Sequence, residues 1–334
     1  MFFNIIFLLV LAYSILFFSN LLARKYNLYD KPNLRKTHEK KASFLGGICL
    51  SLYLIFCLKF FEYDRIVDEI IIISILISII GFLDDKLNLS PGLRLVSKTI
   101  IIFYLFEKGF GITNLGIYFG IELTLGKLSI LFTIGAVLAL INSYNYADGV
   151  DGLASSIFLT SVISLITISY IKYENIDIFL IHILVFNFIF LAFNFGWVVK
   201  TKIFLGNSGS YMLGFLHAYT LIYFFLNSKF HPMIMAWSLA FIFFEFLSTN
   251  LIRISNNKSF LAAGKDHIHY ILLEIFKNKY YVVLVLSLFN LITILLGFFV
   301  TKISENLSLL FFILYGFFYF LMRMNFSKII NIKM

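Results

Sequence analysis

Residues 70–86 read IIIISILISIIGFLDDK, an uncharged run of fourteen residues followed by two adjacent carboxylates, Asp84 and Asp85. A run this apolar predicts a helix that crosses, or nearly crosses, a bilayer. Carboxylates at a helix C-terminus oppose the helix dipole, and unpaired charge beside a membrane is costly. The ordinary interpretation is a solvated helix end, but this position favours a compensating cation, either Lys86 or a divalent ion. Two close carboxylates suit Mg²⁺, which binds few side chains and completes its shell with phosphates.

The composition of the chain indicates that a bilayer is the solvent for most of it. Of its 334 residues, 60% are hydrophobic and 13% are charged, and the mean hydropathy is +0.93. A soluble domain has about 25% charged residues, and no soluble core of this length could bury so much apolar surface. No Pro/Ser-rich linker, low-complexity tract or repeat divides the chain. We therefore expect residues 1–334 to form a single polytopic membrane domain.

The hydrophobic runs predict an all-α integral membrane protein with about eleven transmembrane helices. The first run has no basic segment before it and has Lys and Arg after it, so we expect a retained helix rather than a cleaved signal peptide. The predicted spans are residues 2–22, 44–61, 69–83, 94–107, 128–142, 153–171, 177–195, 210–227, 233–252, 280–300 and 307–322.

The distribution of basic residues predicts the orientation. If the segment after the first span is cytoplasmic, 20 of the 27 Lys and Arg residues lie in or beside cytoplasmic loops and 7 lie outside. The positive-inside rule then places the N-terminus outside and the C-terminus in the cytoplasm. The net charge of +9 follows from this topology and from anionic lipid headgroups, so nucleic acid is not expected as a partner.

The run NSYNYADGVDGLA at residues 142–154 is the strongest functional motif. An ordinary polar turn between two helices explains glycine and one Asp or Asn. It does not explain two Asn and two Asp within ten residues that contain no Lys or Arg. We therefore interpret Asn142, Asn145, Asp148 and Asp151 as site residues.

Two further motifs have both a functional and an ordinary interpretation. Residues 206–210 (GNSGS) open a helix, where backbone N–H groups can bind an anion, although Asn and Ser are also common N-caps. His267 and His269 fit either a metal pair or surface histidines, and basic neighbours such as Arg253 favour a phosphate-handling loop. Acidic residues for Mg²⁺ and basic donors for a diphosphate thus gather on one side. The predicted active-site loops are residues 24–43, 84–98, 142–153, 196–210 and 253–279.

The chain resembles the polyprenyl-phosphate N-acetylhexosamine-1-phosphate transferase superfamily (glycosyltransferase family 4) along almost its whole length. Five motifs occur in the family's order, which makes the resemblance specific. The His-Ile-His pattern, with Glu245 eight residues before Arg253, is more similar to the N-acetylglucosamine-1-phosphate branch than to the muramoyl-pentapeptide branch. The motif residues are Arg35, Lys36, His38, Gly46 and Gly47; Asp84 and Asp85; Asn145, Asp148, Gly149, Asp151, Gly152, Leu153 and Ala154; Phe204, Leu205, Gly206, Gly209 and Ser210; and His267, Ile268 and His269.

This resemblance implies a Mg²⁺-dependent phosphotransferase, with Mn²⁺ as an alternative metal. It implies transfer of a sugar 1-phosphate from a UDP-N-acetylhexosamine to undecaprenyl phosphate, which releases UMP and starts a cell-envelope glycan. It also implies a multi-pass protein of the bacterial inner membrane whose site faces the cytoplasm, and it leaves formation of a homodimer open.

Individual roles are implied in the same way. Asp84 or Asp85 would deprotonate or position the lipid phosphate, and the metal ligands would be Asp84, Asp85 and Asn207. The implied substrate-binding residues are Arg35, His38, Lys98, Asn142, Asn145, Asp148, Asp151, Lys202, Arg253, His267 and His269.

Asn207 departs from the family pattern, which usually has Asp at this position. An amide oxygen can bind Mg²⁺ but brings no negative charge. Smaller departures are residues 41–43, where the family often has a proline, and Tyr270, where it often has a histidine. One alternative is therefore a catalytically weakened homologue that binds lipid phosphate or nucleotide sugar. A transporter is a third hypothesis, but its expected mid-span ionisable residues are limited mainly to Glu245 and His182.

Overall fold

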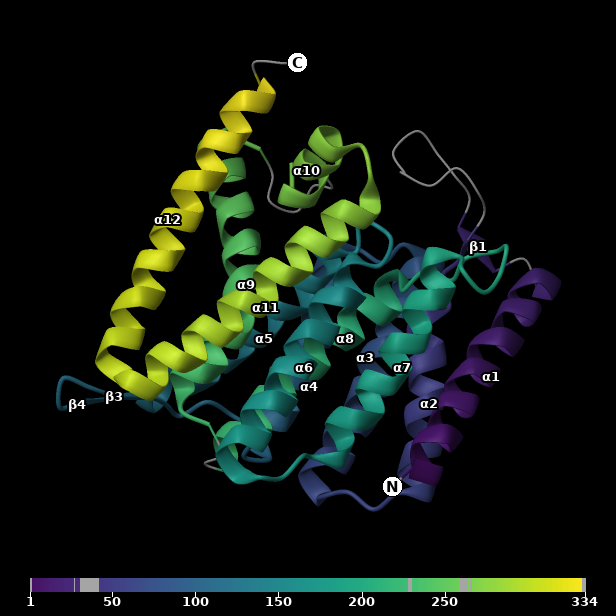
Figure 1. Cartoon of the computed structure of the whole chain (residues 1–334), viewed down its shortest axis with the longest axis horizontal. Coiled ribbons are helices and arrows are strands. Elements are labelled where there is room, and N and C mark those ends of the chain that lie inside the picture. The colour runs from purple at the N-terminus through teal and green to yellow at the C-terminus, as the bar shows by residue number, and fades with distance from the viewer. Residues whose placement is uncertain are drawn as a thin grey trace.

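The computed structural model describes residues 2–26, 28–30, 42–227, 230–258, 264 and 266–331. Helices dominate this part of the chain, and two short strand pairs lie at opposite ends of the helix bundle (Figure 1). The antiparallel pairs are β1 (Tyr29–Asp30) with β2 (Ala42–Ser43) and β3 (Asn114–Tyr118) with β4 (Ile121–Thr124). The helices are α1 (Phe2–Tyr26), α2 (Gly46–Phe60), α3 (Arg65–Leu87), α4 (Pro91–Glu107), α5 (Ser129–Ala147), α6 (Leu153–Tyr173), α7 (Ile178–Phe195), α8 (Gly206–Leu226), α9 (Pro232–Ser255), α10 (Ile268–Phe276), α11 (Lys279–Ile303) and α12 (Glu305–Asn331).

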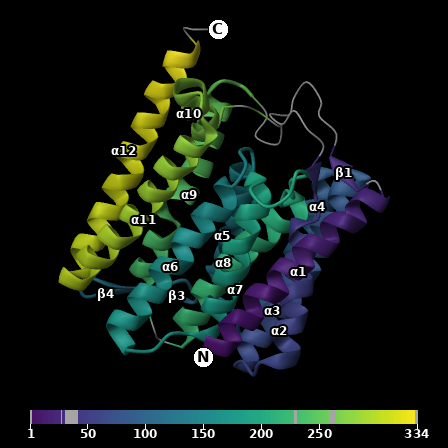
Figure 2. The ribbon, with the colours of Figure 1, turned by 45° about the vertical axis from the view of Figure 1, so that its right-hand side comes forward.

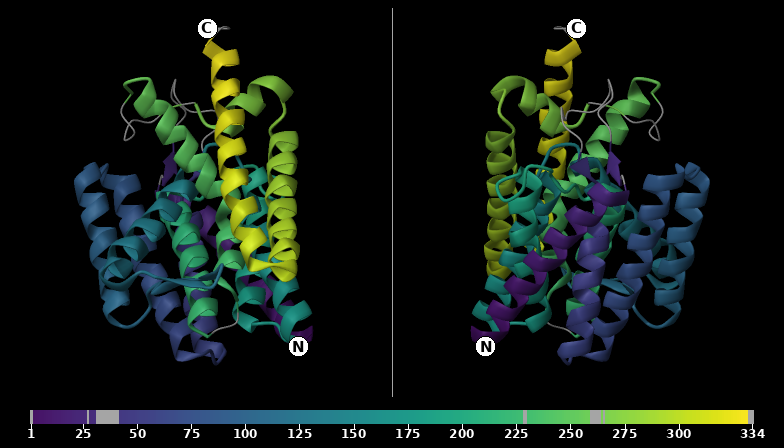
Figure 3. Two further views of the ribbon diagram at one scale, coloured as in Figure 1. Left: turned by 90° about the vertical axis from the view of Figure 1, so that its left-hand side faces the viewer. Right: turned by 90° about the vertical axis from the view of Figure 1, so that its right-hand side faces the viewer.

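Nine helices in the described ranges are long and apolar enough to cross a bilayer, which supports an all-α, multi-pass membrane protein. All eleven predicted runs coincide with helices. However, α2 and α4, with 15 and 17 residues, are shorter than these nine. The count of eleven crossings and their orientation therefore remain predictions. The N-terminal end of α1 and the C-terminal end of α12 lie at opposite ends of the bundle (Figure 3).

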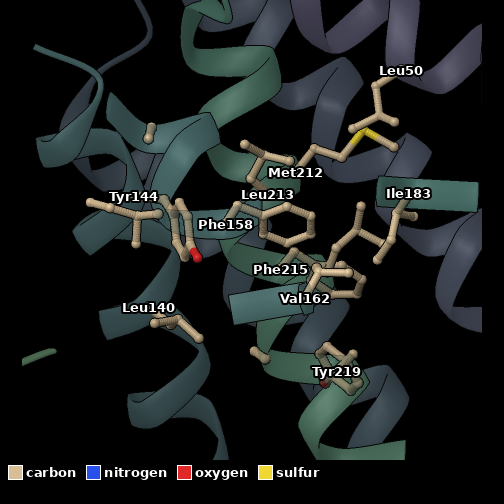
Figure 4. Packing of buried hydrophobic residues seen from close by; sticks show 14 of the residues in the cluster. Leu50, Leu140, Tyr144, Phe158, Val162, Ile183, Met212, Leu213, Phe215 and Tyr219 are labelled. Atoms are coloured by element: carbon tan, nitrogen blue, oxygen red, sulfur yellow. The ribbon is translucent and has the colours of Figure 1, made fainter. Parts of the chain in front are cut away.

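Helix α8 runs through the centre of the bundle, and small residues let its neighbours approach it (Figure 2). Hydrocarbon tails are as apolar as leucine, so close packing replaces the hydrophobic effect between membrane helices. A Cβ on Gly214 would lie 2.6 Å from the Ile141 Cα in α5. The buried side chains of Phe158 in α6 and of Met212 and Phe215 in α8 fill the spaces between helices (Figure 4). The position of α8 is thus fixed by contact with several helices.

Gly81 near the end of α3 allows a close approach to the start of α8. A Cβ at Gly81 would lie 2.5 Å from the Asn207 carbonyl oxygen and from the Ser208 Cα. We expect Gly81→Ala to force these backbones apart, to cost about 1–3 kcal/mol of stability, and to lower the melting temperature in detergent. Gly135→Ala in α5 is the matched control, because nothing lies within 4 Å of that Cβ. Equal melting temperatures for the two variants would contradict this account of the α3–α8 contact.

Candidate active site

The segment immediately before α8 is hydrogen-bonded to strand β2 and to the start of α2. The Ser43 backbone N–H donates to the Lys202 carbonyl oxygen at 3.0 Å, and the Phe204 N–H donates back to the Ser43 oxygen at 2.6 Å. The Gly46 N–H, at the start of α2, donates to the Phe204 oxygen at 2.9 Å. This ladder fixes the chain immediately before α8 and therefore the position of its N-terminal amides.

A cavity of about 590 Å³ lies where the ends of α3 and α5 meet this turn of α8. Its volume is within the range of ligand pockets. Four of the described lining residues are aspartates and one is an arginine, so carboxylate oxygens that can bind a cation outnumber the cationic groups in the lining. The described lining residues are Tyr29, Phe44, Asp84, Asp85, Asn88, Leu89, Arg94, Asp148, Gly149, Val150, Asp151, Asn194, Phe204, Gly206, Asn207 and Tyr270.

Asp84, at the end of α3, is buried and accepts three hydrogen bonds on one carboxylate oxygen. The donors to Oδ2 are Tyr211 Oη at 2.9 Å, Asn207 Nδ2 at 3.0 Å and Arg94 Nη1 at 3.2 Å. Hydrogen bonds to a carboxylate are stronger than those between neutral groups. Asp84 is therefore fixed in position and joins α3, α4 and α8 at the edge of the cavity.

Asp85 accepts from the backbone at the N-terminus of α8. Its Oδ1 receives the Asn207 N–H at 3.1 Å, and its Oδ2 receives the Ser208 N–H at 3.4 Å. A carboxylate is stabilised here by the otherwise unpaired amides and by the helix dipole. Gly206 has φ of +66°, and a Cβ on it would lie 2.6 Å from Asp85 Oδ2. Glycine at this position is what lets the carboxylate approach the turn.

Asn207 connects the carboxylate pair to the 142–154 motif. Its Nδ2 donates to Asp84, while its Oδ1 accepts from Asn145 Nδ2 at 2.7 Å. Asn145 Nδ2 also donates to Ser210 Oγ at 3.1 Å. In this arrangement the amide nitrogen of Asn207, and not its oxygen, faces Asp84.

Lys98 and Asn142 are not among the described residues that line the cavity. Lys98 Nζ donates to Asn142 Oδ1 at 3.3 Å and lies 4.2 Å from the centre of the Tyr211 ring. Since Tyr211 in turn binds Asp84, these residues support the carboxylate from behind.

Asp148 and Asp151 line the cavity on the side of α5 and α6. Burial, together with the charges of Asp85 and Asp151, holds the pKa of the Asp148 carboxyl well above its usual range. Asp151 Oδ2 accepts from Lys202 Nζ at 2.6 Å and from Lys279 Nζ at 2.5 Å. Two cations on one carboxylate leave a positive charge beside the cavity.

His267, His269 and Arg253 are buried rather than on the surface, so the surface interpretation of the histidines was wrong. Arg253 pairs with Asp266, with Nε–Oδ2 at 2.7 Å. Burial lowers the pKa of His267 to about 4, so its ring is neutral at pH 7. Neither histidine is among the described residues of the cavity lining. A Cβ on Gly149, which does line it, would lie 2.6 Å from His269 Nε2.

The donor set fits Mg²⁺ better than a metal that needs a full protein cage. The described residues contain no group of three or more His, Cys, Asp or Glu side chains arranged to hold a metal ion. Mg²⁺ needs only one or two carboxylates beside water and substrate phosphates, and Asp84 and Asp85 provide these. Asn207 could add an oxygen only if its amide rotated.

The structure places five of the predicted site residues in the described lining of one cavity: Asp84, Asp85, Asp148, Asp151 and Asn207. Asn145 and Lys202 bind two of these residues. Arg35 and His38 lie outside the described residues. Arg94, Tyr211 and Lys279 were not named as site residues, although Arg94 and Lys279 fall within the predicted active-site loops. Arg94 and Lys279 were visible as cytoplasmic basic residues beside helix starts, whereas nothing in the pattern distinguished Tyr211.

Known proteins are similar to this chain over the same region. Residues 69–225 match the family model of Glycosyl transferase family 4. The undecaprenyl-phosphate alpha-N-acetylglucosaminyl 1-phosphate transferase of Escherichia coli (strain K12) is 28% identical over 273 residues, covering 78% of this chain and 72% of that protein. The protein of the same name from Yersinia pestis is 25% identical over 333 residues (94% and 90%), and that from Pasteurella multocida is 29% identical over 278 residues (79% and 76%).

Proposed function

Because the chain belongs to glycosyl transferase family 4, we propose that it transfers a sugar 1-phosphate from a UDP-N-acetylhexosamine to undecaprenyl phosphate. The products are UMP and a lipid-linked diphosphate sugar. The observation that carries the proposal is the pair Asp84 and Asp85, held against the first turn of α8 beside a cavity that Asp148 and Asp151 also line. The names of the relatives supply the acceptor, and the chemistry of the cavity supports a diphosphate donor.

We further propose that residues 1–334 form one transferase domain of the bacterial inner membrane, with the cavity on the cytoplasmic side. The multi-pass helices and the bias of Lys and Arg toward that side support this orientation. A nucleotide sugar is a cytoplasmic substrate and undecaprenyl phosphate is a membrane substrate, so a cavity at the membrane boundary suits both.

In the proposed reaction, an oxygen of the lipid phosphate attacks the phosphorus that carries the sugar. The bond from this phosphorus to the bridging oxygen breaks, and UMP leaves with that oxygen. Asp85 lines the cavity and would orient or deprotonate the attacking phosphate. Asp84, fixed by three donors, would hold Arg94 and Asn207 beside the reacting groups.

Asp84 and Asp85 would also hold Mg²⁺, with Asn207 as a third oxygen ligand after rotation of its amide. Bound Mg²⁺ would offset the charges of the two phosphates as they approach each other. Removal of the metal with EDTA is therefore expected to abolish transfer, and added Mg²⁺ is expected to restore it.

The test is a radiolabel transfer assay in detergent with undecaprenyl phosphate and a panel of UDP-N-acetylhexosamines. Mg²⁺-dependent movement of label into lipid would support the proposal and identify the sugar. A folded protein that transfers no label from any donor would contradict it.

The position of Asn207 favours a second candidate, a homologue that binds its substrates but transfers weakly. Asn207 brings no negative charge, and its amide nitrogen donates to Asp84, so it is a weaker metal ligand than a carboxylate would be. Under this alternative the wild-type protein binds UDP-sugar without turnover, and Asn207→Asp switches transfer on.

A further inference from the structure

A buried polar network outside the cavity joins α9 and α12. Glu245 of α9 and Arg323 of α12 are 8% and 1% exposed, and Arg323 Nε donates to Glu245 Oε2 at 2.7 Å. The Tyr319 hydroxyl donates to the same oxygen at 2.8 Å, and Thr249 Oγ1 donates to Glu245 Oε1 at 3.1 Å. Ion pairs inside an apolar bundle are costly unless their polar atoms are hydrogen-bonded. Here the charged atoms other than Arg323 Nη1 have partners among the described residues. Neither charged residue is among the described lining of the cavity.

Both members of this ion pair also bind the backbone just before α10. Glu245 Oε1 accepts from the Ile268 N–H at 2.8 Å, and Arg323 Nη2 donates to the Asp266 carbonyl oxygen at 2.7 Å. Both contacts are to backbone atoms, so they position the main chain at residues 266–268 directly. Arg253 then holds the side chain of Asp266, so the segment is anchored from two helices.

The anchored segment continues into residues that line the cavity or pack against its lining. A Cβ on Gly149 would lie 2.6 Å from both His269 Nε2 and the Tyr270 hydroxyl. Gly149 and Tyr270 themselves line the cavity. A shift of the backbone at residues 266–268 would therefore move this wall, while Asp84 and Asp85 on the opposing elements would stay in place.

We propose that Glu245 and Arg323 are positioning residues that set this wall and thereby the affinity of the cavity for the nucleotide-sugar donor. They act through residues 266–270 and touch neither substrate. The inference rests on the proposed function, and it adds that the run from Asp148 to Asp151, which lines the cavity, contacts the donor. The proposal thus assigns the donor and the lipid acceptor to different parts of the cavity, because the phosphate of the acceptor would contact Asp85.

The test variant is Arg323→Lys, which keeps the charge but loses the planar fork that reaches Glu245 and Asp266 together. The KM for the donor is expected to rise about tenfold, because small displacements remote from the chemistry have effects of this size or larger. The kcat and the KM for undecaprenyl phosphate are expected to stay within about twofold. Tyr319→Phe, which removes one donor to Glu245, is the milder second variant and is expected to change the donor KM in the same direction.

Ser308→Ala is the matched control. It removes the hydrogen bond from Trp237 Nε1 to Ser308 Oγ (2.9 Å), which also joins α9 and α12 but is not part of the network around Asp266. General loosening of this helix pair would therefore appear in the control as well. A similar rise in donor KM for Ser308→Ala would overturn the proposal.

Amide hydrogen exchange of residues 266–276 gives a readout that does not depend on catalysis. Exchange is expected to be faster in Arg323→Lys than in the wild type or in Ser308→Ala. Unchanged exchange, or a fall in kcat with an unchanged donor KM, would overturn the positioning role. Absence of any transfer by the wild type would instead contradict the proposed function, and the exchange comparison would still decide whether Arg323 anchors the segment.

Discussion

Asp85→Asn and Asp84→Asn are each expected to slow transfer about a thousandfold, a loss of several kcal/mol of transition-state stabilisation. The two substitutions act differently. In Asp85→Asn the charge that faces the cavity and the helix amides is lost. In Asp84→Asn the acceptor shared by Arg94, Asn207 and Tyr211 becomes an amide, so the groups around the cavity lose their common partner.

The measurement is kcat at saturating donor, acceptor and Mg²⁺, with UMP release as a second readout. Asp64→Asn is a suitable control because Asp64 caps the other end of α3, where Asn is an equally good N-cap. Its turnover is expected to match that of the wild type. Near-normal turnover in both Asp84→Asn and Asp85→Asn would remove the carboxylate pair from the chemistry.

The positions of the long helices could be predicted because a lipid environment leaves few alternatives. A chain in hydrocarbon must pair its backbone polar groups within each segment, so a long apolar run can only be a helix. Helix α10 and the β3–β4 hairpin escaped prediction. With nine residues α10 is too short for a hydropathy signal. The hairpin turns at Phe119-Gly120, which lacks the Asn, Asp or Gly that usually marks the first position of a tight two-residue turn.

The carboxylate end of the site could also be predicted, because polar residues at the end of an apolar helix stand out from their surroundings. Asp84, Asp85, Asn145 and Asn207 do lie in one hydrogen-bonded group. The burial of His267 could not be predicted in this way. The residues around His267 are distant in the sequence: its ring centre lies 4.5 Å from that of Tyr146, and Arg323, 57 residues beyond Asp266, binds the Asp266 carbonyl oxygen.

Asn207→Asp is expected to make the protein more dependent on Mg²⁺. The substitution removes the N–H donor to Asp84 and sets a third carboxylate beside the existing pair, while Asn145 can still donate to position 207. Without metal, the lost hydrogen bond and the repulsion should destabilise the protein by about 1–3 kcal/mol. With metal, the added charge should raise the affinity for Mg²⁺ on the order of tenfold or more, because Mg²⁺ prefers carboxylate oxygen.

Two measurements separate these effects: the melting temperature in EDTA, and the Mg²⁺ concentration that gives half-maximal stabilisation or transfer. Asn88→Asp is the control, because it adds the same charge to the cavity lining at the end of α3 without replacing the bridge to Asp84. If both variants shift the Mg²⁺ titration equally, the effect is one of general charge and position 207 is not a metal ligand. A shift confined to Asn207→Asp would mean that the wild-type amide holds the carboxylate pair in place without metal, at the expense of affinity for Mg²⁺.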